Sequence, residues 1–199
     1  MTAQIHDSVN YRDNEHALVA YSDGEPFSPV KTGYSPVPAG TACWRGYVCR
    51  YRVKDSVLHL NELRINHRTA DAQSPRRQQP PELNGIAGTW DSASFGPEWQ
   101  FHDVDLPLAY TGGLVIGHKF IRSLYVHMGF HPAWNYEHVD ELRFEQGRLI
   151  EARAASADIA RLRMRIQRGL ELRHEVTPNQ IDQWLADCFD LDYCRNSPT

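Results

Sequence analysis

The feature that most constrains the fold of this chain is a strict two-residue alternation of side-chain character in residues 44–53. Tyr47 and Tyr51 fall on one face of an extended chain, whereas Arg50 falls on the other. Successive side chains of a β-strand point to opposite faces, so this pattern predicts a half-buried strand. After a short polar turn, residues 57–65 return with a second apolar face, which predicts an antiparallel hairpin.

The return strand contains one irregularity. Leu58 and Leu60 keep the two-residue period, but the next large apolar side chain is Leu63. An extra residue on one strand of a pair forms a β-bulge. The spacing therefore predicts a bulge or a strand end near Asn61.

A second hairpin is predicted in residues 140–153. Leu142 and Phe144 alternate with charged residues, and Gln146-Gly147 provides a turn before the chain returns. Alternation of this kind, rather than continuous apolar runs, favours antiparallel pairing.

The remaining strands are less regular. Residues 1–42 are rich in proline, glycine and aspartate, so we expect them to wrap the domain as extended chain, with one short strand at residues 16–21. Residues 106–116 are apolar enough for a buried strand. Gly112 and Gly113 in this run would let a backbone or an aromatic ring approach closely.

The C-terminal part is predicted to be helical. Ile159, Leu162 and Ile166 recur at helical spacing after Ser156, a residue type that favours helix N-termini. These residues also alternate with arginines, so a strand is the other reading, but the helix-forming residue types favour a helix. A second helix is predicted at residues 178–189, with threonine before it and proline at its first position.

The length of the chain limits the number of domains it can form. A chain of 199 residues most simply forms one domain, with two smaller domains as the alternative. We expect one α+β domain over residues 1–199, with a mainly antiparallel, curved sheet at residues 14–153 and two C-terminal helices within residues 156–191. The first residues lack a signal-peptide pattern and no apolar run could span a bilayer, so the expected location is the cytoplasm, away from membranes.

Charge and cysteine spacing exclude several classes of partner and cofactor. A net charge of −4 argues against a dedicated nucleic-acid binder. A basic run nevertheless leaves an anionic partner such as RNA open; it consists of Arg161, Arg163, Arg165, Arg168 and Arg173. The cysteines lack the C-x2-C spacing of zinc sites, so we expect free thiols at Cys43, Cys49, Cys188 and Cys194.

The histidines offer the main candidate for chemistry. His127 and His131 are four residues apart, but Gly129 and Pro132 disfavour a helix there, and no third ligand is evident. No metal or other cofactor is therefore predicted. Acid–base chemistry could combine these histidines with the carboxylates of residues 137–141, although carboxylates that alternate along a strand are normally its solvated face.

Two segments resemble a family of small, largely uncharacterised bacterial cytoplasmic proteins. Residues 44–48 (WRGYV) are similar to the start of its W-R-G-Y-x-A-x-W motif, with Tyr51 in place of the second tryptophan. Residues 125–130 (YVHMGF) resemble its Y-x-H-x-G-F segment, but five residues intervene before the aromatic–glutamate pair Tyr136-Glu137. The resemblance implies an α+β domain with an antiparallel sheet, and it implies no established activity.

Three classes of function fit these observations. A non-enzymatic binding protein is favoured, such as an immunity or antitoxin-like partner that blocks a bacterial toxin, because the chain is small, acidic and without a recognised catalytic motif. The alternatives are a small enzyme that uses His127 and His131, and an RNA- or nucleotide-associated accessory protein that uses the basic run at residues 161–173.

A partner surface is predicted from residue types, because aromatic residues and arginine dominate the energetics of protein interfaces. The densest such set in this chain consists of Trp44, Arg45, Tyr47, Tyr125, His127, His131 and Trp134. The alternative reading is that the aromatic members of this set belong to the core.

Overall fold

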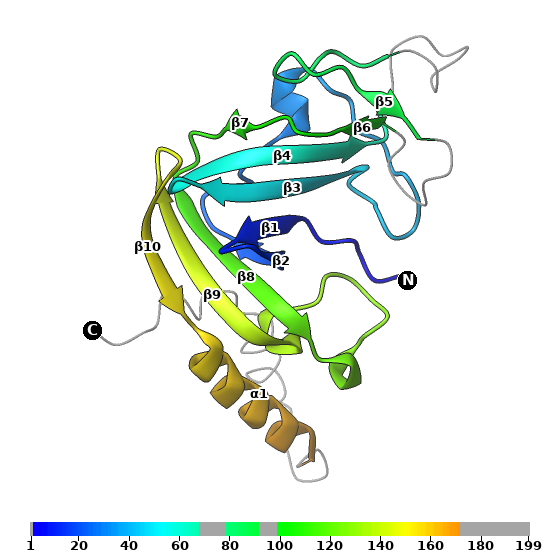
Figure 1. Ribbon diagram of the computed structural model, residues 1–199. Coiled ribbons are helices and arrows are strands. Elements are labelled where there is room, and N and C mark those ends of the chain that lie inside the picture. Colours follow the sequence, from blue (N-terminus) through cyan, green and yellow to red (C-terminus); the bar gives the residue numbers. More distant parts are fainter. Residues whose placement is uncertain (1, 68–78, 92–98, 172–199) are drawn as a thin grey trace.

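The computed structural model describes residues 2–67, 79–91 and 99–171 of the chain (Figure 1). The strands are β1 (Ser8–Tyr11), β2 (Asn14–Tyr21), β3 (Tyr47–Lys54), β4 (Val57–Ile65), β5 (Thr89–Trp90), β6 (Trp99–Phe101), β7 (Leu106–Pro107), β8 (Gly112–Phe120), β9 (Tyr136–Glu145) and β10 (Arg148–Ala154). The helices are the short 3-10 turns η1 (Pro29–Thr32), η2 (Arg122–Leu124) and η3 (Ala133–Asn135) and the longer α1 (Ser156–Glu171).

The sheet curves until its end strand β10 meets β4, beyond which β6 and β5 continue the sheet. Seven strands follow one another in the order β10-β9-β8-β2-β1-β3-β4, and β10 pairs again with β4 where Arg148 lies opposite Val57. A hydrogen bond from the Leu58 N–H to the Gly147 carbonyl (2.9 Å) closes this corner. Figure 1 shows the bend, with β3 and β4 across the upper half and β8, β9 and β10 descending below them.

The pairing is mainly antiparallel, as predicted. Among the strands of the described ranges, β1 and β3 form the one parallel pair. The predicted curved antiparallel sheet is therefore confirmed, with one parallel pair that the alternation did not indicate.

Both predicted hairpins are present. β3 and β4 are joined by Asp55 and Ser56, whose φ angles are 49° and 62°. β9 and β10 are joined by Gln146 and Gly147, with φ angles of 46° and 80°. Two-residue turns with positive φ at both positions match the right-handed twist of the strands they connect.

The predicted bulge in the β4 strand is also confirmed. Arg50 lies opposite Glu62, but the next residue, Tyr51, lies opposite Leu60. Asn61 is thus the extra residue of the pair. The bulge keeps the apolar side chains on both sides of it directed into the core.

The N-terminal segment differs from the expectation. β1 and β2 form a hairpin in the middle of the closed sheet, rather than extended chain around it, and β2 begins before residue 16. Val9 is fully buried and Tyr11 is nearly so. A four-residue strand is too short for a two-residue period to be recognised in the sequence. In addition, Val9 pairs with Tyr51, which is distant in the chain.

The apolar run at residues 106–116 is not a single strand, contrary to the prediction. β7 ends at Pro107, which has no N–H to donate to a neighbouring strand, and β8 begins at Gly112. Between them, Tyr110 turns inward and its hydroxyl donates to the Ser22 carbonyl (2.6 Å). A Cβ at Gly112 would lie 2.6 Å from that hydroxyl, so the expected close approach of a ring is confirmed.

Buried apolar side chains form two clusters on opposite faces of the sheet. Leu114 and Ile116 of β8 belong to the larger cluster, which fills the inside of the curved sheet. Val115, which points the other way, belongs to a smaller cluster that includes Ile159 of α1. The helix thus covers a small area on the outer face.

The helical reading of the C-terminal part is confirmed for Ser156–Glu171. The Ser156 hydroxyl accepts the Val139 N–H (3.0 Å) and lies 3.3 Å from the Val139 carbonyl, so it fixes the start of α1 to β9. The second predicted helix, at residues 178–189, lies outside the described residues. No helix in the described part of the chain is long and apolar enough to cross a membrane.

Candidate functional site

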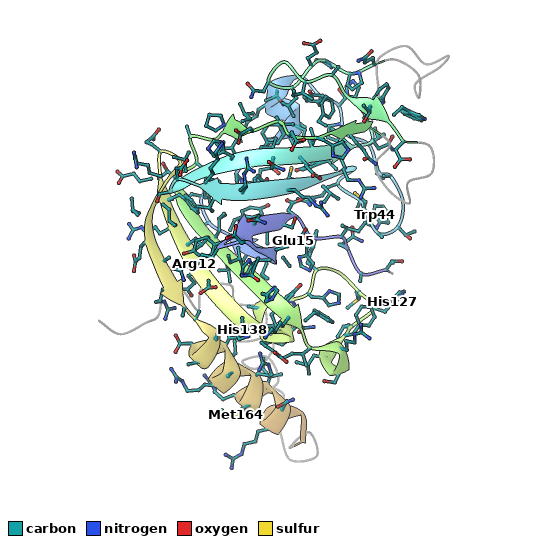
Figure 2. The ribbon with its side chains drawn as sticks, viewed as in Figure 1. Arg12, Glu15, Trp44, His127, His138 and Met164 are labelled. Atoms are coloured by element: carbon teal, nitrogen blue, oxygen red, sulfur yellow. The ribbon has the colours of Figure 1, made fainter. Side chains whose placement is uncertain are left out.

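The segments that precede β3 and follow β8 are brought together by the first residues of the chain. The Gln4 N–H donates to the Gly129 carbonyl (2.7 Å), and the Gln4 side-chain carbonyl accepts the Trp44 N–H (3.1 Å). On the same segment, the Ile5 N–H donates to the Ala42 carbonyl (2.9 Å). The side-chain view shows the result, with Trp44 and His127 on the same side of the molecule (Figure 2).

Large apolar side chains are exposed on this side. Six of them form what we term the apolar patch: Ile5, Trp44, Tyr125, Val126, Met128 and Phe130, with exposed fractions of 36%, 65%, 50%, 55%, 52% and 47%. Four of the six lie in residues 125–130, the loop between η2 and η3. Single exposed apolar residues are ordinary, but a group of them on one surface marks an interaction site.

A half-buried ion pair supports the patch from below. The two terminal guanidinium nitrogens of Arg45 donate to the Asp7 carboxylate (2.8 and 3.0 Å), which also accepts the Cys49 N–H (2.8 Å). Burial alone lowers the pKa of Arg45, but its bonds with Asp7 outweigh burial and raise that pKa above its ordinary value. Arg45 also stacks over the rings of Tyr47 and Phe130, at 4.8 and 5.6 Å.

Two histidines hold the loop in place. The His131 N–H donates to Nε2 of His6 (3.0 Å), so the proton of neutral His6 is on Nδ1, which donates to the Leu18 carbonyl (3.2 Å). Burial, with the positive charge of His131 when protonated, lowers the pKa of His6 below 6.5. The ring of His131 in turn donates from Nε2 to the Val126 carbonyl (3.1 Å), which closes the loop on itself.

Neighbouring rings complete the packing beneath the patch. The ring of Phe130 lies 5.1 Å from His6, and the ring of Tyr125 lies 5.1 Å from His131. The Tyr125 hydroxyl shares a hydrogen bond with Nδ1 of His127 (2.8 Å). The exposed side chains of the loop therefore project from a segment that hydrogen bonds hold in place.

The seven residues predicted as a partner surface occupy different positions. Trp44, Tyr125 and His127 are exposed on this side, and Arg45 lies between the patch and the core. Tyr47 and His131 are buried, so they can support a partner surface without touching a partner.

Trp134 lies elsewhere. It is half-buried in η3, against the smaller core cluster, and its carbonyl accepts a hydrogen bond from Arg163 of α1 (2.7 Å).

Sequence reasoning missed several members of the patch and its support. Ile5, Val126, Met128 and Phe130 lie outside the predicted set, although the large apolar residues of the turn-rich segment 125–130 indicate exposure of the last three. Asp7 carried no local pattern that could identify it. Its role depends on Arg45, 38 positions further along the chain.

The described ranges contain no group of three or more histidine, cysteine or acidic side chains arranged to hold a metal ion. Comparisons of the chain with protein-family models, with curated proteins and with solved structures gave no match.

Proposed function

We propose that this protein is a non-enzymatic binding protein and that the apolar patch is its contact surface for another protein. The observation that carries the proposal is the exposure of Trp44, Tyr125, Met128 and Phe130 on one side of the molecule. Aromatic residues and methionine are enriched at protein interfaces, whereas an isolated fold gains nothing from leaving them in water.

The contacts beneath the patch favour binding. Arg45 is held by Asp7, and the loop is held by His6 and His131, so the exposed side chains are largely positioned before a partner arrives. A surface that is already ordered loses less conformational entropy on association. Arg45 could also supply a charged group at the margin of the contact.

The partner class that we propose is a bacterial toxin, which the protein would block as an immunity or antitoxin-like protein in the cytoplasm. The support for this step is the small size of the chain, its acidic charge and the lack of a recognised catalytic motif in its sequence. The net charge of −4 favours association with a basic partner over an acidic one.

The alternatives have less support in the geometry. His131 is buried and its ring is committed to the loop, so it is poorly placed to meet a substrate. In the basic run, Arg161 pairs with Asp158, and Arg163 donates to the carbonyls of Trp134 and Tyr136. Arg161 and Arg163 are therefore engaged by contacts within the described residues.

Substitution of the patch tests the proposal. The tagged protein is used to isolate its partner from the native host, and the dissociation constant is then measured with purified components. We expect Trp44→Ala and Phe130→Ala each to weaken binding by about 1 kcal/mol or more, roughly five-fold, with little change in the melting temperature. Met164→Ala is the matched control, because Met164 is 60% exposed on α1, outside the patch.

Two results would oppose the proposal. One is a patch variant that binds as tightly as the wild type. The other is a loss of binding that only follows a loss of folded protein, which would make these side chains structural.

A further inference from the structure

A second surface, separate from the apolar patch, gathers three histidines. His118 of β8 lies directly opposite His138 of β9, and their rings are stacked with centroids 6.3 Å apart. His16 of β2 lies on the other side of His118, at 5.3 Å between ring centroids. The three rings form a row across three adjacent strands, and they line a cleft of about 380 Å³.

Backbone carbonyls determine the tautomers of two of these rings. Nδ1 of His16 lies 2.9 Å from the Asn14 carbonyl, and Nδ1 of His118 lies 3.0 Å from the Glu15 carbonyl. A carbonyl can only accept, so each Nδ1 carries a hydrogen. In the neutral form of each ring, Nε2 is therefore the nitrogen that carries no hydrogen.

Two cationic side chains line the same cleft. Arg12 belongs to the β1–β2 turn, where its guanidinium stacks over Tyr11 at 4.9 Å, and Lys119 follows His118 in β8. Their φ angles are 51° and 59°. The left-handed region favours asparagine or glycine over long side chains, so the use of Arg and Lys at both positions indicates a role for their charge.

The charges around the histidines favour an anion. Asp140 is the one carboxylate among the described residues that line the cleft, and the nearby Glu15 carboxylate is directed to Arg50 (3.5 Å). With neutral histidines, Arg12 and Lys119 leave one positive charge in excess.

The environment of His16 explains why a ligand would change its charge. Burial lowers the pKa of His16, with a further lowering by His118, while Asp140 acts in the opposite direction. Neutral His16 is thus favoured when the cleft holds only water. An anion placed beside Nε2 favours the protonated ring.

We infer that this cleft binds a phosphate group, either as free phosphate or as the monoester of a small phosphorylated molecule. Arg12 and Lys119 supply permanent charge, and a protonated His16 can donate a hydrogen bond from Nε2. A phosphate group offers several acceptor oxygens to donors that approach from different strands. The inference does not depend on the function proposed for the apolar patch.

Histidine ring signals in NMR spectra of the full-length protein test this inference. Inorganic phosphate is titrated at about pH 6 and about pH 8, with sodium chloride of equal ionic strength as the reference. We expect saturable shifts of the rings of His16, His118 and His138, and tighter binding at the lower pH. Adenosine monophosphate in a parallel titration distinguishes the two sources, since tighter binding than phosphate indicates a monoester ligand.

Substitutions at the rim give the matched comparison. Lys119→Asn suits the left-handed backbone and removes one charge, and His138→Gln removes an exposed ring, so neither should disturb the fold. We expect each to weaken phosphate binding about five-fold or more, whereas Lys31→Asn on η1 leaves it unchanged. The inference is overturned if phosphate shifts these rings no more than chloride does, or if the rim variants bind as the wild type does.

Discussion

At the scale of single residues, polar side chains inside this protein connect segments that the chain keeps far apart. Asp7 bonds to Arg45 and to the backbone of β3, so a carboxylate before β1 orients a residue before β3. His6 does the same between β2 and the loop that carries the patch. Each of these groups would be costly to bury without its partner.

His6 gives a pH-dependent prediction. Its folded-state pKa is lowered, chiefly by burial, so the unfolded chain binds the proton more tightly. The stability that neutral His6 contributes is therefore present above about pH 6.5 and is lost as the pH falls below that value. Protonation also removes the lone pair that accepts the His131 N–H.

Denaturant unfolding between about pH 8 and pH 5 checks this prediction. We expect His6→Gln to show a weaker decrease in stability on acidification than the wild type. His127→Gln is the control, because His127 is exposed and should leave the slope unchanged. Equal slopes for all three proteins would show that His6 does not titrate as argued. His16 and His67, whose pKa values are also lowered by burial, contribute a common background.

At the scale of secondary-structure elements, the turn between β9 and β10 does more than reverse the chain. Gly147 donates to the Tyr110 carbonyl (2.7 Å) and accepts from Leu58, so it joins β10 to β4. Its φ is 80°, and a Cβ there would lie 2.0 Å from the Leu108 carbonyl oxygen. Both backbone strain and a steric clash therefore oppose any other residue.

Substitution of this glycine tests the importance of the closing corner. We expect Gly147→Ala to lower the free energy of unfolding by about 3 kcal/mol or more, or to prevent folding. Gly24→Ala is the matched control, since Gly24 has a φ of 97° and a Cβ at this position would have no neighbouring atom within 4 Å, so about 1 kcal/mol is expected. Similar values for both variants, measured by urea unfolding, would show that strain alone matters and that the clash is relieved cheaply.

At the scale of the whole molecule, the sheet that closes on itself links the hairpins into one structure. β1 and β2 lie between β3 and β8, so the two predicted hairpins are bridged by the N-terminal strands on one side and by the β4–β10 corner on the other. The larger core cluster draws side chains from both halves, including Val9, Leu60 and Phe144. We therefore expect the described domain to unfold in a single cooperative transition.

Two buried thiols report on this transition. Cys43 and Cys49 are free and buried, and burial raises the pKa of both thiols, so the reactive thiolate is scarce. In a variant that carries Cys188→Ser and Cys194→Ser, we expect neither thiol to react with an aromatic disulfide reagent until the protein unfolds. Both should then react with the same denaturant midpoint as the change in tryptophan fluorescence.

Separate midpoints for the two thiols would contradict a single transition. The wild-type chain, denatured without reductant, should show four free thiols. A lower count would overturn the prediction that all four cysteines are reduced.

Local patterns in the sequence were sufficient for the elements whose causes are local. Two-residue alternation and turn residues identified both hairpins, the break between Leu60 and Leu63 identified the bulge at Asn61, and helical spacing identified α1. In each case, the deciding interactions lie within a few residues of one another.

How these elements come together depends instead on tertiary contacts. The parallel pairing of β1 with β3 places Asp7 beside Arg45. The order of β2, β8 and β9 in the sheet places His16, His118 and His138 in one row. The exposure of the patch likewise depends on the base that holds its loop. Such contacts join residues far apart in the chain, and no local period encodes which of many apolar strands or polar side chains will become neighbours.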